Sequence, residues 1–285
     1  DIPDIVFTAF QEREYNLEGT LTVLSGDSGE VHWSMLAPTD DGSVQFASTG
    51  GVVIGDLEGD GSPDICVAGH KVAVICMEAT GQFKWAAGEE FSQSGAPAMA
   101  DMDGDGKVEV ILGRQIFTHD GELQGIGSEG RGSVDTNSVT SFAVDWDNDG
   151  FLELIAGNTI YSRFGETIME FDTEDGYPAV ADMDLDGRPD LVVVAEGSIQ
   201  VFGNDGEFLW GSTIVGEGDG GPPTIADYDG DGWPEVGVAG EGSYTVFDDD
   251  SSVMWVKYST DVSSGHTGSA VFDFEGDGIA EVLYA

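Results

Sequence analysis

The sequence has few basic residues, few cysteines and no long apolar segment. Only 9 Lys and Arg stand against 55 Asp and Glu, which gives a formal net charge of -46. A chain this acidic repels nucleic acid phosphates and anionic membrane surfaces, so its natural partners are cations. No run of about 18 apolar residues occurs, so we expect no membrane insertion. The chain shows no signal peptide or initiator Met and begins inside a repeat, as a piece of a longer protein would.

Histidine and cysteine are too sparse to indicate an enzyme. The histidines are scattered singly, at His32, His70, His119 and His266. We therefore expect no catalytic activity, although the sequence leaves open a glycosidase-like pair of carboxylates. Cys66 and Cys76 lie across an expected hairpin. They form either a cross-strand disulfide or a pair of small buried side chains.

A nine-residue acidic loop occurs six times, and it dominates what the sequence does contain. Asp stands at positions 1 and 5, Asp or Glu at positions 3 and 9, and Gly at position 6. The copies begin 45, 44, 37, 45 and 46 residues apart. They span residues 56–64, 101–109, 145–153, 182–190, 227–235 and 273–281.

Strand signals surround each loop. Around one copy, the runs 178–181 and 191–194 flank the loop, and the runs 198–202 and 207–210 follow it across a Gly turn. Four-stranded units of this period predict an all-β fold, a β-propeller of four-stranded antiparallel blades. Trp33, Trp85, Trp210 and Trp255 recur at the outermost strand, where we expect blade-to-blade packing.

We expect one propeller domain over residues 1–285. The predicted units are 1–48 (partial), 49–94, 95–138, 139–175, 176–220, 221–266 and 267–285 (partial). Residues 3–10 resemble the second strand of a further unit. Six blades follow if this chain closes on itself, and seven follow if the natural chain is longer.

The loop chemistry predicts calcium. Carboxylates at positions 1, 3 and 5 of a tight turn converge on one point, and like charges at that distance need a counterion. Oxygen-only ligands suit Ca²⁺ better than Mg²⁺, and the lack of His and Cys argues against Zn²⁺ or copper. An EF-hand is excluded because its acidic ligand stands at position 12 between helices.

Variation among the copies identifies the ligand atoms. Position 7 shares no side-chain chemistry, so only its backbone carbonyl is expected to bind, whereas position 2 is always large and apolar and is expected to pack beneath the ion. Glu58 and Glu275, which replace Asp at position 3, mark the two sites expected to be weakest or rearranged. The expected ligands are Asp56, Glu58, Asp60, Ser62 and Asp64; Asp101, Asp103, Asp105, Lys107 and Glu109; Asp145, Asp147, Asp149, Phe151 and Glu153; Asp182, Asp184, Asp186, Arg188 and Asp190; Asp227, Asp229, Asp231, Trp233 and Glu235; and Asp273, Glu275, Asp277, Ile279 and Glu281.

These loops, with Gly-Ala-Pro at 95–97 and Phe-Gly at 202–203, resemble the FG-GAP repeats of integrin α-subunit propellers and the related bacterial VCBS repeats. The resemblance covers almost the whole chain. It implies Ca²⁺ at the turn between the first two strands of each blade, and partner-binding connections on the opposite face. Those connections are 35–48, 88–94, 125–137, 211–220 and 258–267. They are either plain solvated loops or, at 125–137 or around His266, a ligand surface.

We therefore expect an extracellular, secreted or cell-surface module that recognises a protein or glycan in an adhesion-like role, with calcium as a structural ion. Trp146 and Trp233 are candidate stacking residues for a glycan. The alternative is a non-catalytic scaffold or accessory domain of a larger secreted or surface protein. The high residual negative charge fits a saline or marine setting, where salt screens the repulsion.

Overall fold

The computed structural model describes residues 2–10, 18–39, 43–89, 95–134, 138–261 and 268–284, which form β-strands joined by turns. Within these ranges, no helix has the length and apolar character needed to span a bilayer. The expected all-β fold is confirmed.

Strands β5 to β24 form five successive blades of four antiparallel strands, named A to D in chain order, in which each strand pairs with the next. The first two blades are β5 (Val52–Gly55), β6 (Asp64–His70), β7 (Val74–Glu78), β8 (Phe83–Ala87) and β9 (Ala98–Ala100), β10 (Glu109–Leu112), β11 (Gln115–Phe117), β12 (Leu123–Ile126). The third and fourth are β13 (Ser141–Val144), β14 (Glu153–Ala156), β15 (Thr159–Tyr161), β16 (Thr167–Glu170) and β17 (Tyr177–Ala181), β18 (Asp190–Ala195), β19 (Ser198–Phe202), β20 (Phe208–Thr213). The fifth is β21 (Thr224–Ala226), β22 (Glu235–Gly240), β23 (Ser243–Phe247), β24 (Val253–Tyr258).

The two ends of the chain carry shorter units. The first unit pairs β1 (Ile5–Phe10), β2 (Glu18–Leu24) and β3 (Val31–Met35), which correspond to strands B, C and D. The last unit pairs β25 (Ala270–Phe272) with β26 (Glu281–Leu283), which correspond to strands A and B. Within the described ranges, no strand pairing joins the last unit to the first, so the closure required for a six-blade ring is not formed there.

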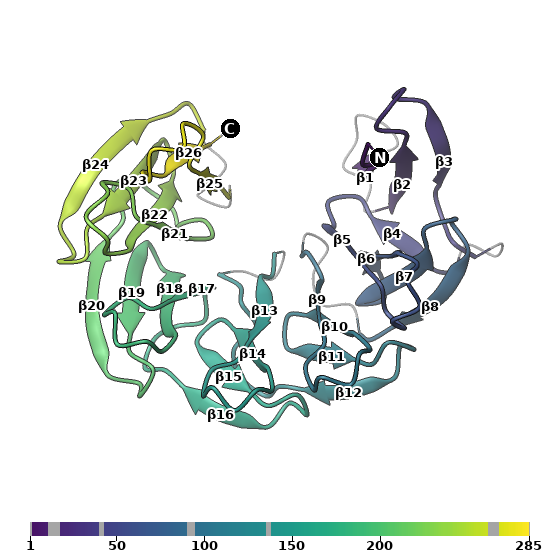
Figure 1. Cartoon of the computed structure of the whole chain (residues 1–285), viewed down its shortest axis with the longest axis horizontal. Helices are drawn as coiled ribbons and strands as arrows, with labels where there is room; N and C mark the ends of the chain where they lie inside the picture. Colours follow the sequence, from purple (N-terminus) through teal and green to yellow (C-terminus); the bar gives the residue numbers. More distant parts are fainter. Residues whose placement is uncertain are drawn as a thin grey trace.

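The blades stand side by side around an arc (Figure 1). The A strands β5, β9, β13, β17 and β21 line its inner side, and the D strands β8, β12, β16, β20 and β24 lie on its outer rim. The N- and C-termini face each other across the opening of the arc. Because strands in a blade alternate in direction, every A–B loop lies at one end of the blades, and every B–C and D–A connection lies at the other.

One strand lies where the sequence predicts only a connection. Within 35–48, β4 (Gln45–Ala47) pairs with both β2 and β6 and so joins the first unit to the first blade. Phe46 is fully buried in this strand. The sequence did not predict this strand because three residues are too few to show a strand periodicity. We attribute its extended conformation to the burial of Phe46 between the two units.

The core lies between blades rather than within them. Val192 and Val201 of the fourth blade pack in one cluster with Val236 and Val238 of the fifth. All six residues of β18 are buried, since a neighbouring blade covers each face of the strand. This two-sided burial explains why the B strands are continuously apolar instead of alternating.

The outer tryptophans take part in the same packing. Trp33 Nε1 donates to the Ala79 carbonyl and Trp85 Nε1 to the His119 carbonyl, both at 2.9 Å. Each acceptor lies at the C–D turn of the following blade. The expected role in blade-to-blade packing is confirmed for this pair.

Cys66 and Cys76 form a disulfide. They face each other across β6 and β7 with their Cα atoms 4.2 Å apart, and both are fully buried. Of the two alternatives left by the sequence, the structure shows the covalent one, placed within the core cluster that the first two blades share.

Candidate metal centres

Each acidic loop is the A–B turn of its unit. In the second blade, β9 ends at Ala100, one residue before position 1, and β10 begins at Glu109, which is position 9. The two ends of the loop are therefore fixed by a strand pair, with Glu109 directly opposite Ala100.

Three hydrogen bonds recur in all six loops. The carboxylate at position 1 accepts from the Gly N–H at position 6 at 2.6–3.1 Å. The carboxylate at position 5 accepts from the N–H at position 7 at 2.8–3.0 Å. The carboxylate at position 9 accepts from the N–H at position 2 at 2.5–3.1 Å. Backbone amides thus orient the carboxylates of each loop. The second oxygen of the position 1 carboxylate also accepts a loop N–H in every copy except the fourth.

The turn depends on left-handed backbone conformations. The glycine at position 6 has φ between 86° and 95° in every copy. Glycine adopts this conformation without steric cost, which explains its presence at position 6 in all six copies. Position 4 is also left-handed, even where it is Asn148 (φ 60°) or Leu185 (φ 58°).

Among the described residues, at least five loops bring their carboxylates together. Positions 1, 3 and 9 present oxygens within 4.8 Å of one another at Asp56, Glu58 and Asp64; Asp101, Asp103 and Glu109; Asp145, Asp147 and Glu153; Asp182, Asp184 and Asp190; and Asp227, Asp229 and Glu235, the last set with Asp231 from position 5. The side chains at position 7 are all exposed; they are Ser62, Lys107, Phe151, Arg188, Trp233 and Ile279.

Burial separates the two ends of the loop. Positions 4 to 7 are exposed in all five loops of the complete blades, whereas position 9 is at most 7% exposed in these loops. Position 2 is buried there as well, at Leu57, Met102, Trp146, Met183 and Tyr228. The expected packing of position 2 is therefore confirmed for these loops. It is wrong for Phe274 of the last loop, which is 63% exposed because no following blade covers it among the described residues.

The fifth loop fits a cation best. Glu235 has no exposed surface, and its Oε1 is buried without a hydrogen-bond partner, as is Asp182 Oδ1 in the fourth loop. Burial, reinforced by repulsion from Asp229, Asp227 and Asp231, raises the pKa of Glu235 to about 7. A buried carboxylate oxygen without a partner costs free energy, which a bound cation would recover.

Burial has the same effect on the other ninth positions. It raises the pKa of Glu109, Glu153 and Asp190, and neighbouring loop carboxylates reinforce the shift. The donor set contains only oxygen atoms, which suits a hard divalent ion such as Ca²⁺.

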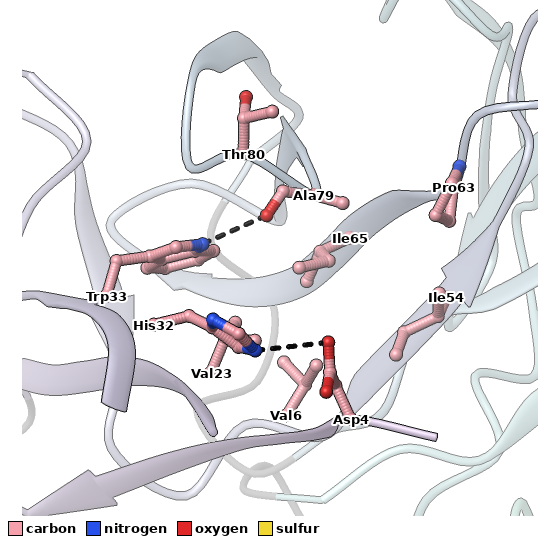
Figure 2. A pocket seen from close by; sticks show the side chains of 10 residues that line it. All are labelled: Asp4, Val6, Val23, His32, Trp33, Ile54, Pro63, Ile65, Ala79 and Thr80. Carbon is pink, nitrogen blue, oxygen red and sulfur yellow. Dashed lines mark hydrogen bonds and ion pairs between the residues drawn. The ribbon is translucent and has the colours of Figure 1, made fainter. Parts of the chain in front are cut away.

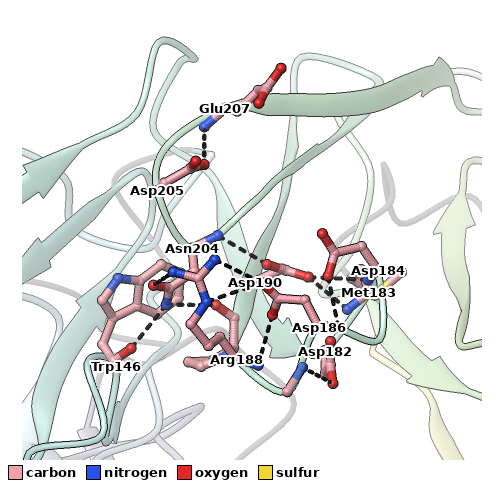
Figure 3. A network of polar contacts seen from close by, with 12 residues as sticks. Trp146, Asp182, Met183, Asp184, Asp186, Arg188, Asp190, Asn204, Asp205 and Glu207 are labelled. Atoms are coloured by element: carbon pink, nitrogen blue, oxygen red, sulfur yellow. Dashed lines mark hydrogen bonds and ion pairs between the residues drawn. The ribbon is translucent and has the colours of Figure 1, made fainter.

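The fourth loop is tied to the neighbouring blade (Figure 3). Asn204, from the C–D turn, donates its N–H to Asp190 Oδ1 at 3.0 Å and its side-chain amide to the Trp146 carbonyl at 2.9 Å. Arg188 forms an ion pair with Asp186 at 2.7 Å, so its side chain turns onto the position 5 carboxylate. The fourth loop is therefore part of the packing between the third and fourth blades.

The two loops with Glu at position 3 differ from the others. In the four copies with Asp there, that side chain accepts from the N–H at position 5 at 3.0–3.2 Å. Glu58 instead pairs with Lys84, which also contacts Asp64 Oδ1 at 2.9 Å. The pKa of Glu275 is raised by its contact with Glu281. The sequence singled out both glutamates but gave no indication of Lys84.

A polar cavity lies at the end of the blades opposite the acidic loops. It has a volume of about 340 Å³ and is lined by residues from D–A connections and one B–C turn, namely Arg131, Ser133, Val134, Glu174, Asp175, Glu196 and Asp219. Asp175 accepts from the backbone N–H of Arg131 and of Gly132 at 3.0 Å each. Burial raises the pKa of Asp175 despite these bonds. Part of the predicted 125–137 surface thus lines a cavity, while residues 135–137 and His266 lie outside the described residues.

The two candidate stacking tryptophans differ in exposure. Trp146 is only 3% exposed and packs edge-on against Phe171, so its prediction as a glycan platform is wrong. Its place at position 2 of a loop, beneath the next blade, explains the burial. Trp233 is 37% exposed.

An apolar pocket of about 600 Å³ lies between the first unit and the first blade (Figure 2). Pro63 and Ile65 line it, and His32 pairs with Asp4 at its edge at 3.4 Å. At the interface between the first and second blades, Val108 and Val110 take the places of Pro63 and Ile65. There Leu57, from position 2 of the first loop, packs in the same cluster as these two valines. The pocket therefore lies at the position where an apolar side chain packs between two blades elsewhere in the structure.

Comparison with solved structures supports the fold. The chain matches the V. cholerae biofilm matrix protein Bap1 with a TM-score of 0.79 at 17% identity, over 100% of this chain and 73% of that one. It matches a Bacillus licheniformis rhamnogalacturonan lyase with a TM-score of 0.60 at 17% identity, over 94% of this chain and 50% of that one. It matches BBS1N, from a complex with ARL6DN, with a TM-score of 0.53 at 14% identity, over 82% of this chain and 75% of that one. At these identities the similarity shows the fold alone.

No curated protein matches the chain by sequence. The family model described as FG-GAP-like repeat matches residues 56–112, 182–238 and 227–284, which together are more than half of the chain. Each matched stretch begins at position 1 of an acidic loop. The chain therefore belongs to the FG-GAP-like repeat family, as the resemblance of its loops predicts.

Proposed function

We propose that this chain is an extracellular recognition module of the adhesion type, which binds a ligand without catalysis and uses calcium as a structural ion. The observation that carries the metal assignment is the repeated loop geometry. Six copies orient their carboxylates with the same three backbone hydrogen bonds, and the fifth leaves Glu235 Oε1 buried without a partner.

Calcium is the ion that this donor set favours. The loops with Asp at position 3 offer carboxylates at positions 1, 3, 5 and 9 and a backbone carbonyl at position 7; they span 101–109, 145–153, 182–190 and 227–235. Several flexible oxygen ligands suit Ca²⁺ better than the strict octahedron of Mg²⁺. Since the ion binds the native state, each site stabilises the fold by about 2.7 kcal/mol at a hundredfold excess of calcium over Kd.

Calcium titration tests this assignment. We expect isothermal titration calorimetry to detect several Ca²⁺ sites, and EDTA to lower the melting temperature sharply while added Mg²⁺ restores little of it. Asp229→Asn should remove one site. Asp250→Asn changes an exposed acid outside the loops and should remove none. Identical melting curves with Ca²⁺ and with EDTA would contradict the structural role of the ion.

The ligand surface that we propose is the polar cavity opposite the loops. A cavity of about 340 Å³ with several carboxylates is suited to accept hydroxyl hydrogens of a sugar, so a glycan is favoured over a protein. The net charge of -46 makes a neutral glycan a better ligand than an anionic one. The Cys66–Cys76 disulfide supports an oxidising, extracellular location, where salt would screen the surface charge.

A glycan array with neutral and acidic polysaccharides tests the ligand proposal. Binding should weaken in Glu174→Gln and Asp219→Asn, which change the cavity lining. It should be unchanged in Glu207→Gln, which changes an exposed acid at the opposite end of the blades. Depolymerisation of any bound polysaccharide would contradict the non-catalytic role. Binding of proteins alone would point to a protein ligand, and an inert domain would favour the scaffold role.

A further inference from the structure

The outer strand contains a bulge in the first unit and in each of the five blades. In each pairing of strands C and D the register shifts, and one residue of strand D is left without a cross-strand partner. A bulge of this kind redirects one side chain. The bulge residues are His32, Lys84, Gln124, Ile168, Leu209 and Met254.

In the first blade the bulge directs a lysine onto the acidic loop. Lys84 Nζ contacts Asp64 Oδ1 at 2.9 Å and forms a second ion pair with Glu58 Oε1. The Lys84 side chain is 17% exposed and the Asp64 side chain 4%. The Lys84 ammonium is thus held by two carboxylates of one loop, those at positions 3 and 9.

A similar contact, more exposed to solvent, occurs in the first unit. His32, at the bulge of β3, pairs with Asp4, which precedes β1 as Asp64 begins β6 (Figure 2). In both units the bulge residue therefore faces an acid at the start of strand B, since Asp4 aligns with Asp64 in the strand register. In the fifth blade Met254 stands at the bulge, and there Glu235 Oε1 is buried without a partner.

We propose that the first loop carries its own cation: the Lys84 ammonium occupies the place that a divalent ion takes in the other loops, so residues 56–64 bind no divalent ion. The proposal rests on the proposed calcium binding by the other loops. Two positions of the site, 3 and 9, are already engaged by Nζ, and a divalent ion beside the ammonium would meet strong repulsion. Glu58 at position 3 completes this arrangement, since it replaces the Asp that accepts a loop N–H in four other copies.

Exchange of the bulge residues tests the proposal. Lys84→Met introduces the residue of the fifth blade into the first, and Met254→Lys does the reverse. Leu209→Met is the control, because it changes a bulge residue without changing its charge. Ca²⁺ stoichiometry is measured by isothermal titration calorimetry at physiological salt, and melting temperatures are measured with Ca²⁺ and with EDTA.

We expect Lys84→Met to bind one more Ca²⁺ than the wild type and Met254→Lys to bind one fewer, with Leu209→Met unchanged. In EDTA, Lys84→Met should melt about 5 °C lower than the wild type, because Glu58 and Asp64 lose their counterion, and Ca²⁺ should restore most of this loss. An unchanged stoichiometry in Lys84→Met overturns the proposal, even if Met254→Lys does not fold.

The two proposals fail in different ways. If no variant binds Ca²⁺, the calcium assignment fails, and melting in EDTA still decides whether Lys84 is the counterion of the first loop. A Lys84→Met variant as stable in EDTA as the Leu209→Met control would overturn that role.

Discussion

Position 2 of the loop is buried between blades in one copy and exposed in another, so truncating its side chain should lower the stability of the protein strongly in the first and little in the second. Met102 is fully buried, in a cluster with Ile111 and Leu154, whereas Phe274 is 63% exposed. Met102→Ala removes buried apolar volume and should cost roughly 2–5 kcal/mol. With an unfolding entropy of about 2.1 cal/mol/K per residue over 285 residues, the melting temperature should fall by about 3–8 °C.

Phe274→Ala is the matched control. Its ring contacts Phe272 at 5.3 Å between centroids but is otherwise exposed, so the melting temperature should fall by less than about 2 °C. Both variants are melted by circular dichroism with Ca²⁺ and with EDTA, so that loss of packing is separated from loss of an ion. Equal shifts in melting temperature for the two variants would refute the argument that contact with the next blade, rather than the loop itself, determines how much the side chain at position 2 stabilises the protein.

Three further predictions concern the covalent bond, the backbone and the pH dependence. Replacing Cys66 and Cys76 by Ala should lower the free energy of unfolding in urea by roughly 2.5–3 kcal/mol, through the greater entropy of the unfolded chain; an unchanged midpoint would show that the bridge adds nothing. Leu185→Gly should raise the melting temperature by about 1–2 °C, since Leu185 has a φ of 58° and is 48% exposed, while Leu123→Gly, at an exposed leucine within β12, should lower it. In EDTA, the raised pKa of Glu235 gives stability that is fully present below the ordinary value of 4.5 and is lost as the pH rises through about 7. Wild-type melting in EDTA should therefore fall between pH 5 and 8, and a Glu235→Gln variant that shows the same fall would contradict this assignment.

The loops could be predicted from the sequence because each is a local structure. Position 6 needs a left-handed φ, positions 1 and 5 need carboxylates to accept loop amides, and all of these requirements fall within nine residues. The four-stranded unit is nearly as local, since each strand pairs with the next in sequence. The period of the repeat was therefore enough to predict the all-β propeller architecture.

Contacts between units could not be predicted in the same way. The sequence predicts packing at position 2, but only the arrangement of blades shows that Trp146 is too buried to stack on a glycan and that Phe274 at the same position is exposed. The sequence did not predict β4, because a strand of three residues shows no periodicity. Its formation depends on the burial of Phe46 between two units, which is a tertiary contact.

For the acidic loops, too, some properties follow from the local sequence and others only from the tertiary structure. The sequence by itself determined their number, their turn geometry and the oxygen-only character of their donors, because these properties depend on neighbouring residues in one chain segment. Only the tertiary structure decided which oxygens are buried and which already have a partner. Lys84 lies 20 residues from Asp64 and reaches it through a bulge in the outer strand. Glu235 Oε1 has no such partner, since an apolar Met254 stands at the equivalent bulge.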